Sequence, residues 1–321
     1  KESFDRNNIA EGSGFLYNFI LKSIYNLFQY DPNIGRYVSS IFSILSIFTL
    51  TYLSKLVSKN NSHLLTLFLV SFNVFLILYS MESRVYSFLF FLINFNLIFL
   101  FKVIEYDKKN KNFKIYLYLF FFTQIISILT HLFSIIVFFS IAVFCVLNYL
   151  LYKKRIKYLN QHLTIIFIFI LFYLLYYFYF YPGSIINWIQ QPSIKFLTNL
   201  YFSKFFGSRA IGLFHLILLI FLIYKFKSKI LYKFDEKLIL LIILISSYAL
   251  PLIVGFIKPV ILARYIIFVL IPIILLTSYL IFELKNMKIR NLIISFFIVI
   301  NFGNQFFETN IKQFFQERPF Y

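Results

Sequence analysis

Charged residues are scarce in this sequence, at 13% of its 321 residues, against about 25% in soluble domains. Hydrophobic residues make up 61% of the chain, and the mean hydropathy is +0.82. A water-soluble fold has no interior large enough for this much Phe, Ile, Leu and Tyr. The composition therefore excludes an ordinary soluble globular protein and indicates a membrane-embedded chain.

Several chemical signatures are also absent. The single cysteine, Cys145, lies in an apolar run and has no second thiol for a disulfide or a metal site, so we expect a buried apolar role. His63, His162 and His215 lack the spacing to each other and to carboxylates that a zinc site needs. The sequence contains no glycine-rich phosphate-binding loop, which removes support for soluble-nucleotide chemistry. By itself, the sequence therefore indicates no cofactor.

Long apolar runs make up most of the sequence. The first run, 15–28, is short, contains Lys22 and follows a polar start, so we predict an interfacial helix there. The later runs predict about ten membrane-spanning helices, over 34–56, 64–79, 85–101, 115–130, 132–152, 163–181, 211–224, 238–257, 261–282 and 292–302. Strands of a β-barrel are too short to explain runs of this length. We therefore predict an all-α fold: a polytopic transmembrane bundle over 34–303, a juxtamembrane segment over 1–33 and a short tail over 304–321.

The net charge of +19 is distributed in clusters between the apolar runs. Nucleic-acid-binding proteins gather basic residues on one soluble face, so this pattern does not favour nucleic acid as a partner. When sides are assigned by alternation, more than half of the 31 basic residues fall in loops that we assign to the cytoplasm, at 55–59, 102–114, 153–157, 225–237 and 285–290. The N-terminal stretch, the 182–209 loop and the C-terminal tail then face outside, where we expect the functional site.

The sharpest polar motif is the turn at 79–86, Tyr-Ser-Met-Glu-Ser-Arg-Val-Tyr, between two predicted spans on the outer side. Charged groups at membrane depth usually mark a site, because they are costly unless they are paired or hydrated. The guanidinium group of Arg84 is suited to phosphate. An interfacial turn in which Arg84 simply pairs with Glu82 explains the motif equally well.

A second motif, Arg264-Tyr265 with Pro272 downstream, opens a late span at its outer end. Arg264 is a candidate phosphate ligand, and Lys258, one short loop away, is a candidate second cation for the same anion. Arginine and tyrosine also favour the membrane interface, so an anchoring role is the alternative.

The third motif, Thr130-His131 with Ser134, lies at the outer junction of two predicted spans. A lone membrane histidine is more often a hydrogen-bonded structural residue than a catalyst, and both interpretations stay open here. The 182–209 loop carries Trp188 and Lys195 and is a candidate gate, although the same residues suit an ordinary interfacial belt.

The order and placement of these motifs resemble those of the multi-span GT-C glycosyltransferases. The resemblance is to family-39-like members related to the dolichyl-phosphate-mannose protein mannosyltransferases and the bacterial aminoarabinose transferase, and it covers most of the chain. It rests on Tyr79, Ser80, Glu82, Arg84 and Tyr86; on Thr130, His131 and Phe133; and on Arg264, Tyr265 and Pro272.

The resemblance implies a glycosyltransferase of the bacterial inner membrane. Such an enzyme moves a sugar from a polyprenyl-phosphate donor to a lipid, glycan or protein acceptor at the extracytoplasmic face. It implies a donor-phosphate site made of Arg84, Arg264, Tyr265 and Lys258, supported by Glu82, Tyr86 and His131. The family's catalytic Asp lies upstream of the region that this chain covers, so we expect a truncated N-terminus, with Asp5 as the nearby candidate. The family sometimes uses a divalent cation at the phosphate.

Two other functions account for a bundle with intramembrane arginines. A flippase or transporter of lipid-linked sugars predicts matched halves with inverted repeats or broken helices, and the sequence shows no such symmetry. An O-antigen polymerase or ligase predicts a large external loop with essential Arg and His, for which 182–209 is short. The glycosyltransferase is therefore the leading hypothesis.

Overall fold

The computed structural model describes residues 15–28, 31–105, 111–152, 157–180, 205–231, 235–257 and 262–307. Nearly all of these residues are helical, because a lipid interior offers backbone groups no other hydrogen-bond partners. The first helices are α2 (Phe15–Phe28), α3 (Pro32–Val57), α4 (Ser62–Ser71), α5 (Val74–Ser80), α6 (Tyr86–Glu105) and α7 (Lys111–Thr130). The 3₁₀ helix η1 (Leu132–Ser134) is followed by α8 (Ile135–Tyr152), α9 (Lys157–Phe180), α11 (Arg209–Lys225), α12 (Lys227–Leu231) and α13 (Glu236–Ile257). The last elements are the 3₁₀ helix η3 (Ala263–Val269), α14 (Leu270–Phe282) and α15 (Met287–Phe307).

The predicted all-α membrane bundle is confirmed, but its number of spans is not. Each of the ten predicted ranges contains helix. Within the described part of the chain, six helical stretches are long and apolar enough to cross a membrane, or seven if α4 and α5 form one broken span. α11, with 17 residues, is shorter than the ~20 that an untilted span needs. A bend of 54° between α4 and α5 divides the range that we predicted as one continuous helix at 64–79.

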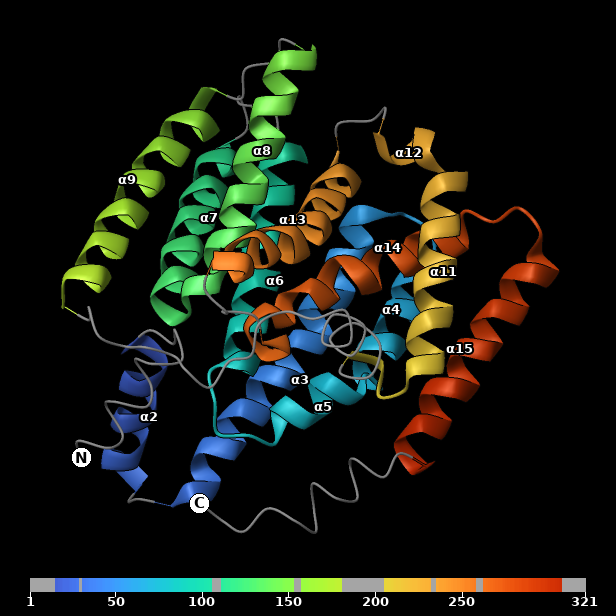
Figure 1. Cartoon of the computed structure of the whole chain (residues 1–321), viewed down its shortest axis with the longest axis horizontal. Coiled ribbons are helices and arrows are strands. Elements are labelled where there is room, and N and C mark those ends of the chain that lie inside the picture. Colours follow the sequence, from blue (N-terminus) through green and yellow to red (C-terminus); the bar gives the residue numbers. More distant parts are fainter. Residues whose placement is uncertain are drawn as a thin grey trace.

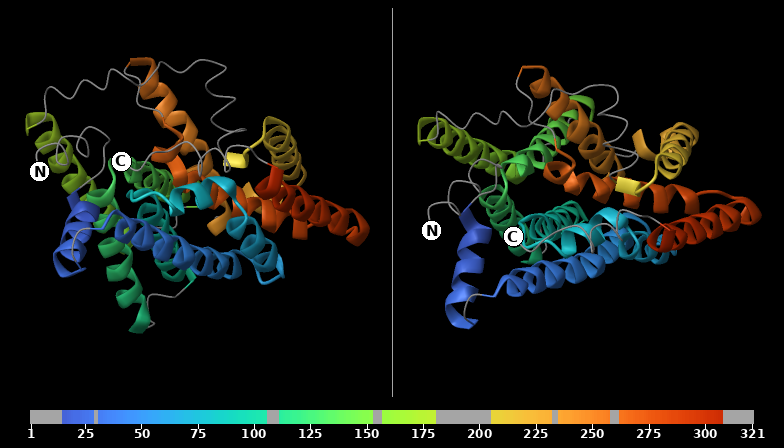
Figure 2. Two further views of the ribbon diagram at one scale, coloured as in Figure 1. Left: turned by 90° about the horizontal axis from the view of Figure 1, so that it is seen from below. Right: turned by 60° about the horizontal axis from the view of Figure 1, so that its bottom comes forward.

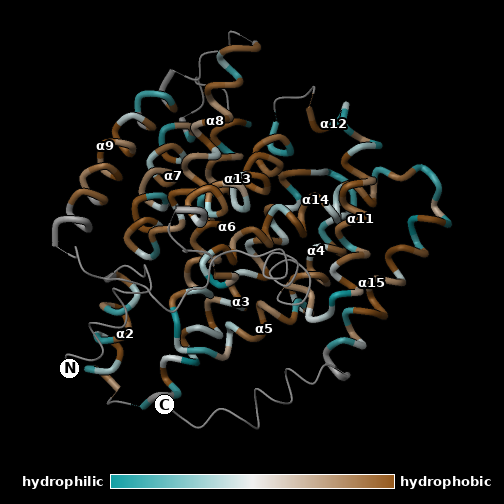
Figure 3. Tube along the Cα trace, in the orientation of Figure 1, coloured by the Kyte–Doolittle hydropathy of each residue, from teal (hydrophilic) through white to brown (hydrophobic). Residues whose placement is uncertain are grey.

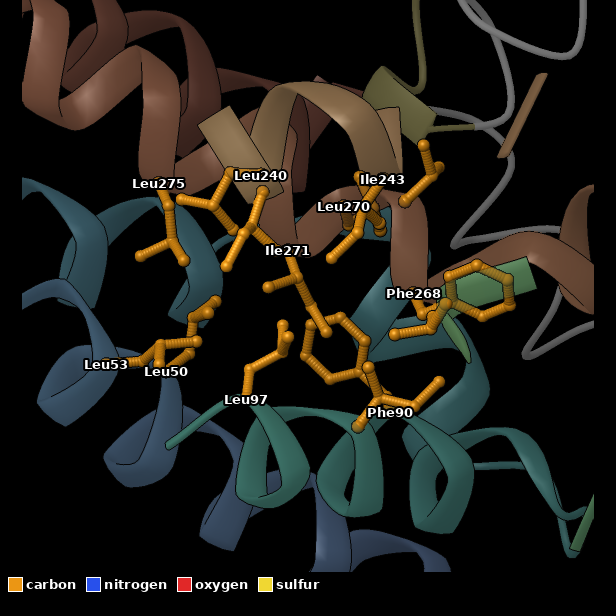
Figure 4. Close-up of a cluster of buried hydrophobic side chains, with 14 of the residues drawn as sticks. Leu50, Leu53, Phe90, Leu97, Leu240, Ile243, Phe268, Leu270, Ile271 and Leu275 are labelled. Carbon is orange, nitrogen blue, oxygen red and sulfur yellow. The ribbon is translucent and has the colours of Figure 1, made fainter. Parts of the chain in front are cut away.

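The helix formed by η3 and α14 lies at the centre of the bundle, and nearly all of its side chains are buried. Figure 4 shows Leu270 and Ile271 of this helix in the middle of an apolar cluster. The surrounding side chains are Leu50 and Leu53 of α3, Phe90 and Leu97 of α6, and Leu240 and Ile243 of α13. A helix that is apolar on all sides is expected in such a position. Its burial fixes the place of the Arg264-Tyr265 motif, which lies at its first turn.

The outer faces of the bundle are apolar as well. Figure 3 shows hydrophobic residues over the peripheral helices α9, α11 and α15. Large side chains on these and other helices are exposed, among them Phe48, Phe122, Phe172, Ile217 and Val299. Exposed apolar surface on this scale is expected of a protein surrounded by lipid rather than water. Cys145 is buried in α8, as the sequence predicted.

α2 matches the helix predicted at 15–28. Figures 1 and 2 show it at the edge of the bundle, beside the beginning of α3. Tyr17 and Leu21 on one face are buried, whereas Phe19, Leu27 and Phe28 are exposed. The helix is therefore attached to the bundle by one face only, and its location at the membrane interface stays a prediction.

The two ends of the central helix carry different chemistry. η3 contacts α6, and the rings of Tyr86, His131 and Tyr265 contact one another, so the beginnings of α6, η1 and η3 lie near one another. At the other end of α14, Glu283 forms an ion pair with Lys229 of α12. This ion pair joins two of the Lys-rich clusters that the sequence assigned to one side. Which end faces the cytoplasm stays a prediction.

Asn73 stabilises the break between α4 and α5. Its side-chain Oδ1 accepts a hydrogen bond from the backbone N–H of Leu76 at 3.0 Å and caps α5. Its Nδ2 donates to the carbonyl oxygen of Phe205 at 3.1 Å, which ties the break to the segment before α11. One side chain thus satisfies backbone groups that a broken helix would otherwise leave without partners. The run stays mainly apolar on both sides of Ser71 and Asn73, so the sequence analysis treated it as one continuous helix.

We predict that Asn73→Ala lowers the free energy of unfolding by about 1–2 kcal/mol, because the capping bond and the bond to Phe205 are both lost. Thermal or denaturant unfolding of the protein in detergent measures the change. Asn61→Ala is the matched control, because Asn61 precedes α4 without a side-chain capping bond. Equal stability of the two variants would contradict the proposed role of Asn73.

Candidate functional site

The turn between α5 and α6 carries the first motif. Arg84 and Glu82 form an ion pair there, with 3.5 Å between Arg84 Nε and Glu82 Oε2. The Arg84 side chain is 40% exposed and that of Glu82 is 10% exposed, so the pair is partly solvated and contributes little stability. The pairing expected of a simple interfacial turn is therefore present, and a ligand role for Arg84 stays a prediction.

Small polar side chains of α3 hold this turn in place. Ser39 Oγ donates a hydrogen bond to the carbonyl oxygen of Arg84 at 3.3 Å and is also hydrogen-bonded to the Tyr17 hydroxyl at 2.8 Å. Ser40 Oγ donates to the carbonyl oxygen of Ser80 at 2.9 Å. These bonds satisfy carbonyl groups at the point where the helical ladder is interrupted. They also fix the backbone on which Arg84 stands.

Gly35 allows α3 to approach the turn closely. A β-carbon at this position would lie 1.9 Å from Ser83 Oγ and 2.8 Å from Ser83 Cβ. It would also lie 2.7 Å from the Tyr25 hydroxyl. Rotation of Ser83 relieves the first contact but not the second, so any larger residue requires the turn itself to move.

The second and third motifs meet the first in an aromatic cluster made of Tyr79, Tyr86, His131, Phe133 and Tyr265. The ring centroids of Tyr86 lie 5.2 Å from Tyr79, 5.9 Å from His131 and 6.4 Å from Tyr265. Tyr265 lies 5.2 Å from both His131 and Phe133. Residues from four separate elements thus form one continuous set of ring contacts. The sequence analysis had assigned three of these residues, Tyr86, His131 and Tyr265, to the candidate site.

Arg264 lies against this aromatic cluster. Its guanidinium carbon is 6.0 Å from the ring centroid of Tyr86 and 5.7 Å from that of Tyr265, both within the range of cation–π attraction. The side chain begins at the first turn of η3, whose backbone departs from helical geometry at Ile266. The motif around Tyr86 and the motif around Arg264, which are far apart in the sequence, are therefore in contact.

His131 lies between two candidate spans, at the α7–η1 junction, and is fully buried. Its Nδ1 accepts a hydrogen bond from the backbone N–H of Phe133 at 3.2 Å and caps η1. Burial and, to a smaller extent, the positive charge of Arg264 together lower the pKa of His131 to about 3. The ring is therefore neutral at physiological pH. The structural role expected of a lone membrane histidine is present, beside a possible ligand role.

Other predicted positions have different outcomes. Lys258, Asp5 and residues 182–204 lie outside the described residues. His215 is buried, and its Nε2 is hydrogen-bonded to the Thr277 hydroxyl at 3.1 Å, which joins α11 to α14. Among the residues that the structure describes, no group of three or more His, Cys, Asp or Glu side chains is arranged to hold a metal ion.

The sequence interpretation missed the support that α3 gives to the site. Gly35 and Ser39 are four residues apart, so they lie on one face of α3, with Ser40 beside them. Small residues at this spacing on an otherwise apolar helix are the signal that predicts close contact with a neighbouring segment.

These features define a multi-span α-helical membrane protein with an arginine and an aromatic cluster at one end of its central helix. The fold is GT-C-like: it is similar to that in the crystal structure of ArnT from Cupriavidus metallidurans in the apo state, with a TM-score of 0.61 at 14% sequence identity. The match covers 86% of this chain and 50% of that chain, so the chain spans about half the length of ArnT. No protein-family model and no curated protein sequence matches the chain.

We predict that Gly35→Ala destabilises the protein in thermal unfolding measurements in detergent. In an exposed helix the same substitution stabilises by up to about 1 kcal/mol, because glycine is a poor helix former. Here the added β-carbon displaces the turn that carries Arg84, and overpacking of this kind costs about 1–3 kcal/mol. The sign of the change in thermal stability is the test. A stabilised Gly35→Ala variant would show that the turn is not in close contact with α3 at this position.

Proposed function

We propose that the protein is a membrane glycosyltransferase that transfers a sugar from a polyprenyl-phosphate donor to an acceptor at the extracytoplasmic face. The observation that carries the proposal is the contact of Arg264 with Tyr86 and Tyr265 at one end of the central helix. The GT-C-like fold supports it. The cell membrane is proposed to be a bacterial inner membrane, and the acceptor a lipid, a glycan or a protein.

The aromatic cluster suits the donor's chemistry. Guanidinium N–H donors lie in the plane of the group and match phosphate oxygens, whereas the face of the group contacts aromatic rings. The rings near Arg264 attract its positive charge and hold the side chain beside them, and guanidinium N–H donors suit an anion. Tyr86 and Tyr265 also supply apolar ring surface beside the charge, as a ligand with a phosphate and a hydrocarbon chain requires.

In the proposed reaction an acceptor oxygen or nitrogen attacks the anomeric carbon of the donor sugar. The bond from that carbon to the phosphate oxygen breaks, and polyprenyl phosphate leaves with the bonding electron pair. The acceptor's proton passes to a carboxylate base, for which Asp5 is the candidate in this chain. Arg264 stabilises the negative charge that develops on the departing phosphate.

Arg84 has a more peripheral place in the proposal. It stands two residues before Tyr86, in a turn that α3 holds by hydrogen bonds, and it carries the ion pair with Glu82. We propose that Arg84 and Lys258 add positive charge at the mouth of the site, where the phosphate enters from the membrane. Because the Arg84 side chain is 40% exposed, solvent and salt screen its charge.

We predict that Arg264→Ala lowers kcat/KM for sugar transfer by about 100-fold or more, the usual effect of removing one donor that stabilises transition-state charge. Transfer from a polyprenyl-phosphate sugar, measured with the full-length protein in liposomes, checks the prediction. Arg264→Lys should restore part of the activity, because the charge returns without the planar fork of donors.

The matched control is Arg290→Ala. The guanidinium carbon of Arg290 also lies over an aromatic ring, 5.3 Å from the centroid of Phe282, but toward the Lys-rich end of the bundle. This variant should transfer sugar at the wild-type rate. Unchanged turnover in Arg264→Ala would remove the proposed phosphate role, and equal losses in both variants would point to a general effect on folding.

A further inference from the structure

The orientation of the His131 ring is set by the start of η1. Nδ1 accepts the backbone N–H of Phe133 at 3.2 Å, so Nδ1 carries no hydrogen in this arrangement. A neutral imidazole has one hydrogen, and it must therefore be on Nε2. The ring presents a single N–H donor on the side away from its capping bond.

That donor has no hydrogen-bond partner among the described residues. His131 Nε2 is buried, and no side-chain or backbone atom in the described part of the chain accepts a hydrogen bond from it. Buried polar groups in native structures are nearly always paired, and an exception calls for a specific explanation. The other nitrogen of the same ring is fully used, so a wrongly oriented ring does not explain the exception.

The surroundings of Nε2 indicate what the missing acceptor is. The ring packs against Tyr86 and Tyr265, the two tyrosines that also contact Arg264. The positive charge of Arg264 acts on His131, and together with burial it keeps the imidazole neutral. A neutral donor can stand beside a guanidinium group without repulsion, and the two together favour an acceptor that carries negative charge.

We propose that His131 binds the ligand directly, with its Nε2–H donating a hydrogen bond to a phosphate oxygen held beside Arg264. The proposal rests on the function proposed above, because it takes the polyprenyl-phosphate group as the anion. It assigns His131 two separate roles: Nδ1 fixes the start of η1 and the ring orientation, and Nε2–H binds the phosphate by a hydrogen bond.

The two roles are separated by two substitutions. In His131→Asn the amide oxygen takes the place of Nδ1, so the cap of η1 is kept, as asparagine is a favoured capping residue, while the Nε2 donor is lost. In His131→Gln the amide nitrogen reaches the place of Nε2, while the capping acceptor is lost. A purely structural histidine predicts that the Asn variant behaves like wild type and the Gln variant does not. A ligand-binding Nε2 predicts the reverse order for phosphate binding.

The experiment measures binding of polyprenyl monophosphate, and of the corresponding polyprenol, to the full chain in lipid nanodiscs. Loss of one hydrogen bond to a charged acceptor should weaken monophosphate binding about 10- to 100-fold in His131→Asn. Binding of the polyprenol and the thermal stability should stay at the wild-type level. His131→Gln should bind the monophosphate more tightly than His131→Asn, in spite of a lower thermal stability.

The outcomes distinguish failure of this proposal from failure of the proposed function. If wild type binds the monophosphate and His131→Asn binds it equally well, the role of Nε2 is overturned and the glycosyltransferase proposal stands. If wild type shows no preference for the monophosphate over the polyprenol, both proposals fall. If His131→Asn keeps wild-type stability and monophosphate binding and only His131→Gln loses both, His131 is a structural residue only.

Discussion

The structure depends on the burial of one apolar helix, η3–α14, at the centre of the bundle. Because this helix is apolar on every side, it can be packed only where other helices surround it, and α3, α6 and α13 do so. Its first turn is then held against the beginnings of α6 and η1, the places where the chain leaves helical geometry. Arg264 and Tyr265 are brought to Tyr86 and His131 by this packing, rather than by any attraction among the polar residues themselves.

Departure from helix is costly in a membrane protein, and three interruptions in the described bundle are supported by polar side chains. Asn73 caps α5 after the break that follows α4, His131 caps η1 after α7, and Ser39 and Ser40 bond carbonyl groups of the turn before α6. Two of these three interruptions carry the candidate site. The same hydrogen bonds that make the interruptions tolerable in lipid therefore hold the site residues in place.

Helix positions and site motifs could be predicted from the sequence because both are local. Long apolar runs define helices, and the residues around Tyr86, His131 and Arg264 stood out because polar residues are rare in such runs. What the sequence did not reveal is non-local: two isolated polar residues, Ser71 and Asn73, do not show that a mainly apolar run bends, and the close approach of Gly35 to Ser83 joins α3 to a turn far along the chain. The count of about ten spans was not confirmed for a related reason, since length and hydropathy do not separate a short or bent helix from a true span.

The neutrality of His131 follows from the same packing that brings the motifs together. Burial alone disfavours the imidazolium ion, and the nearby guanidinium group of Arg264 disfavours it again, so the two donors do not compete as charges. Tyr86 and Tyr265, which both residues contact, attract the cation of Arg264. One positive charge, one neutral donor and an apolar wall are thereby combined around the same two rings. A charged headgroup attached to a hydrocarbon chain needs each of these three features, and a purely structural junction needs none of them.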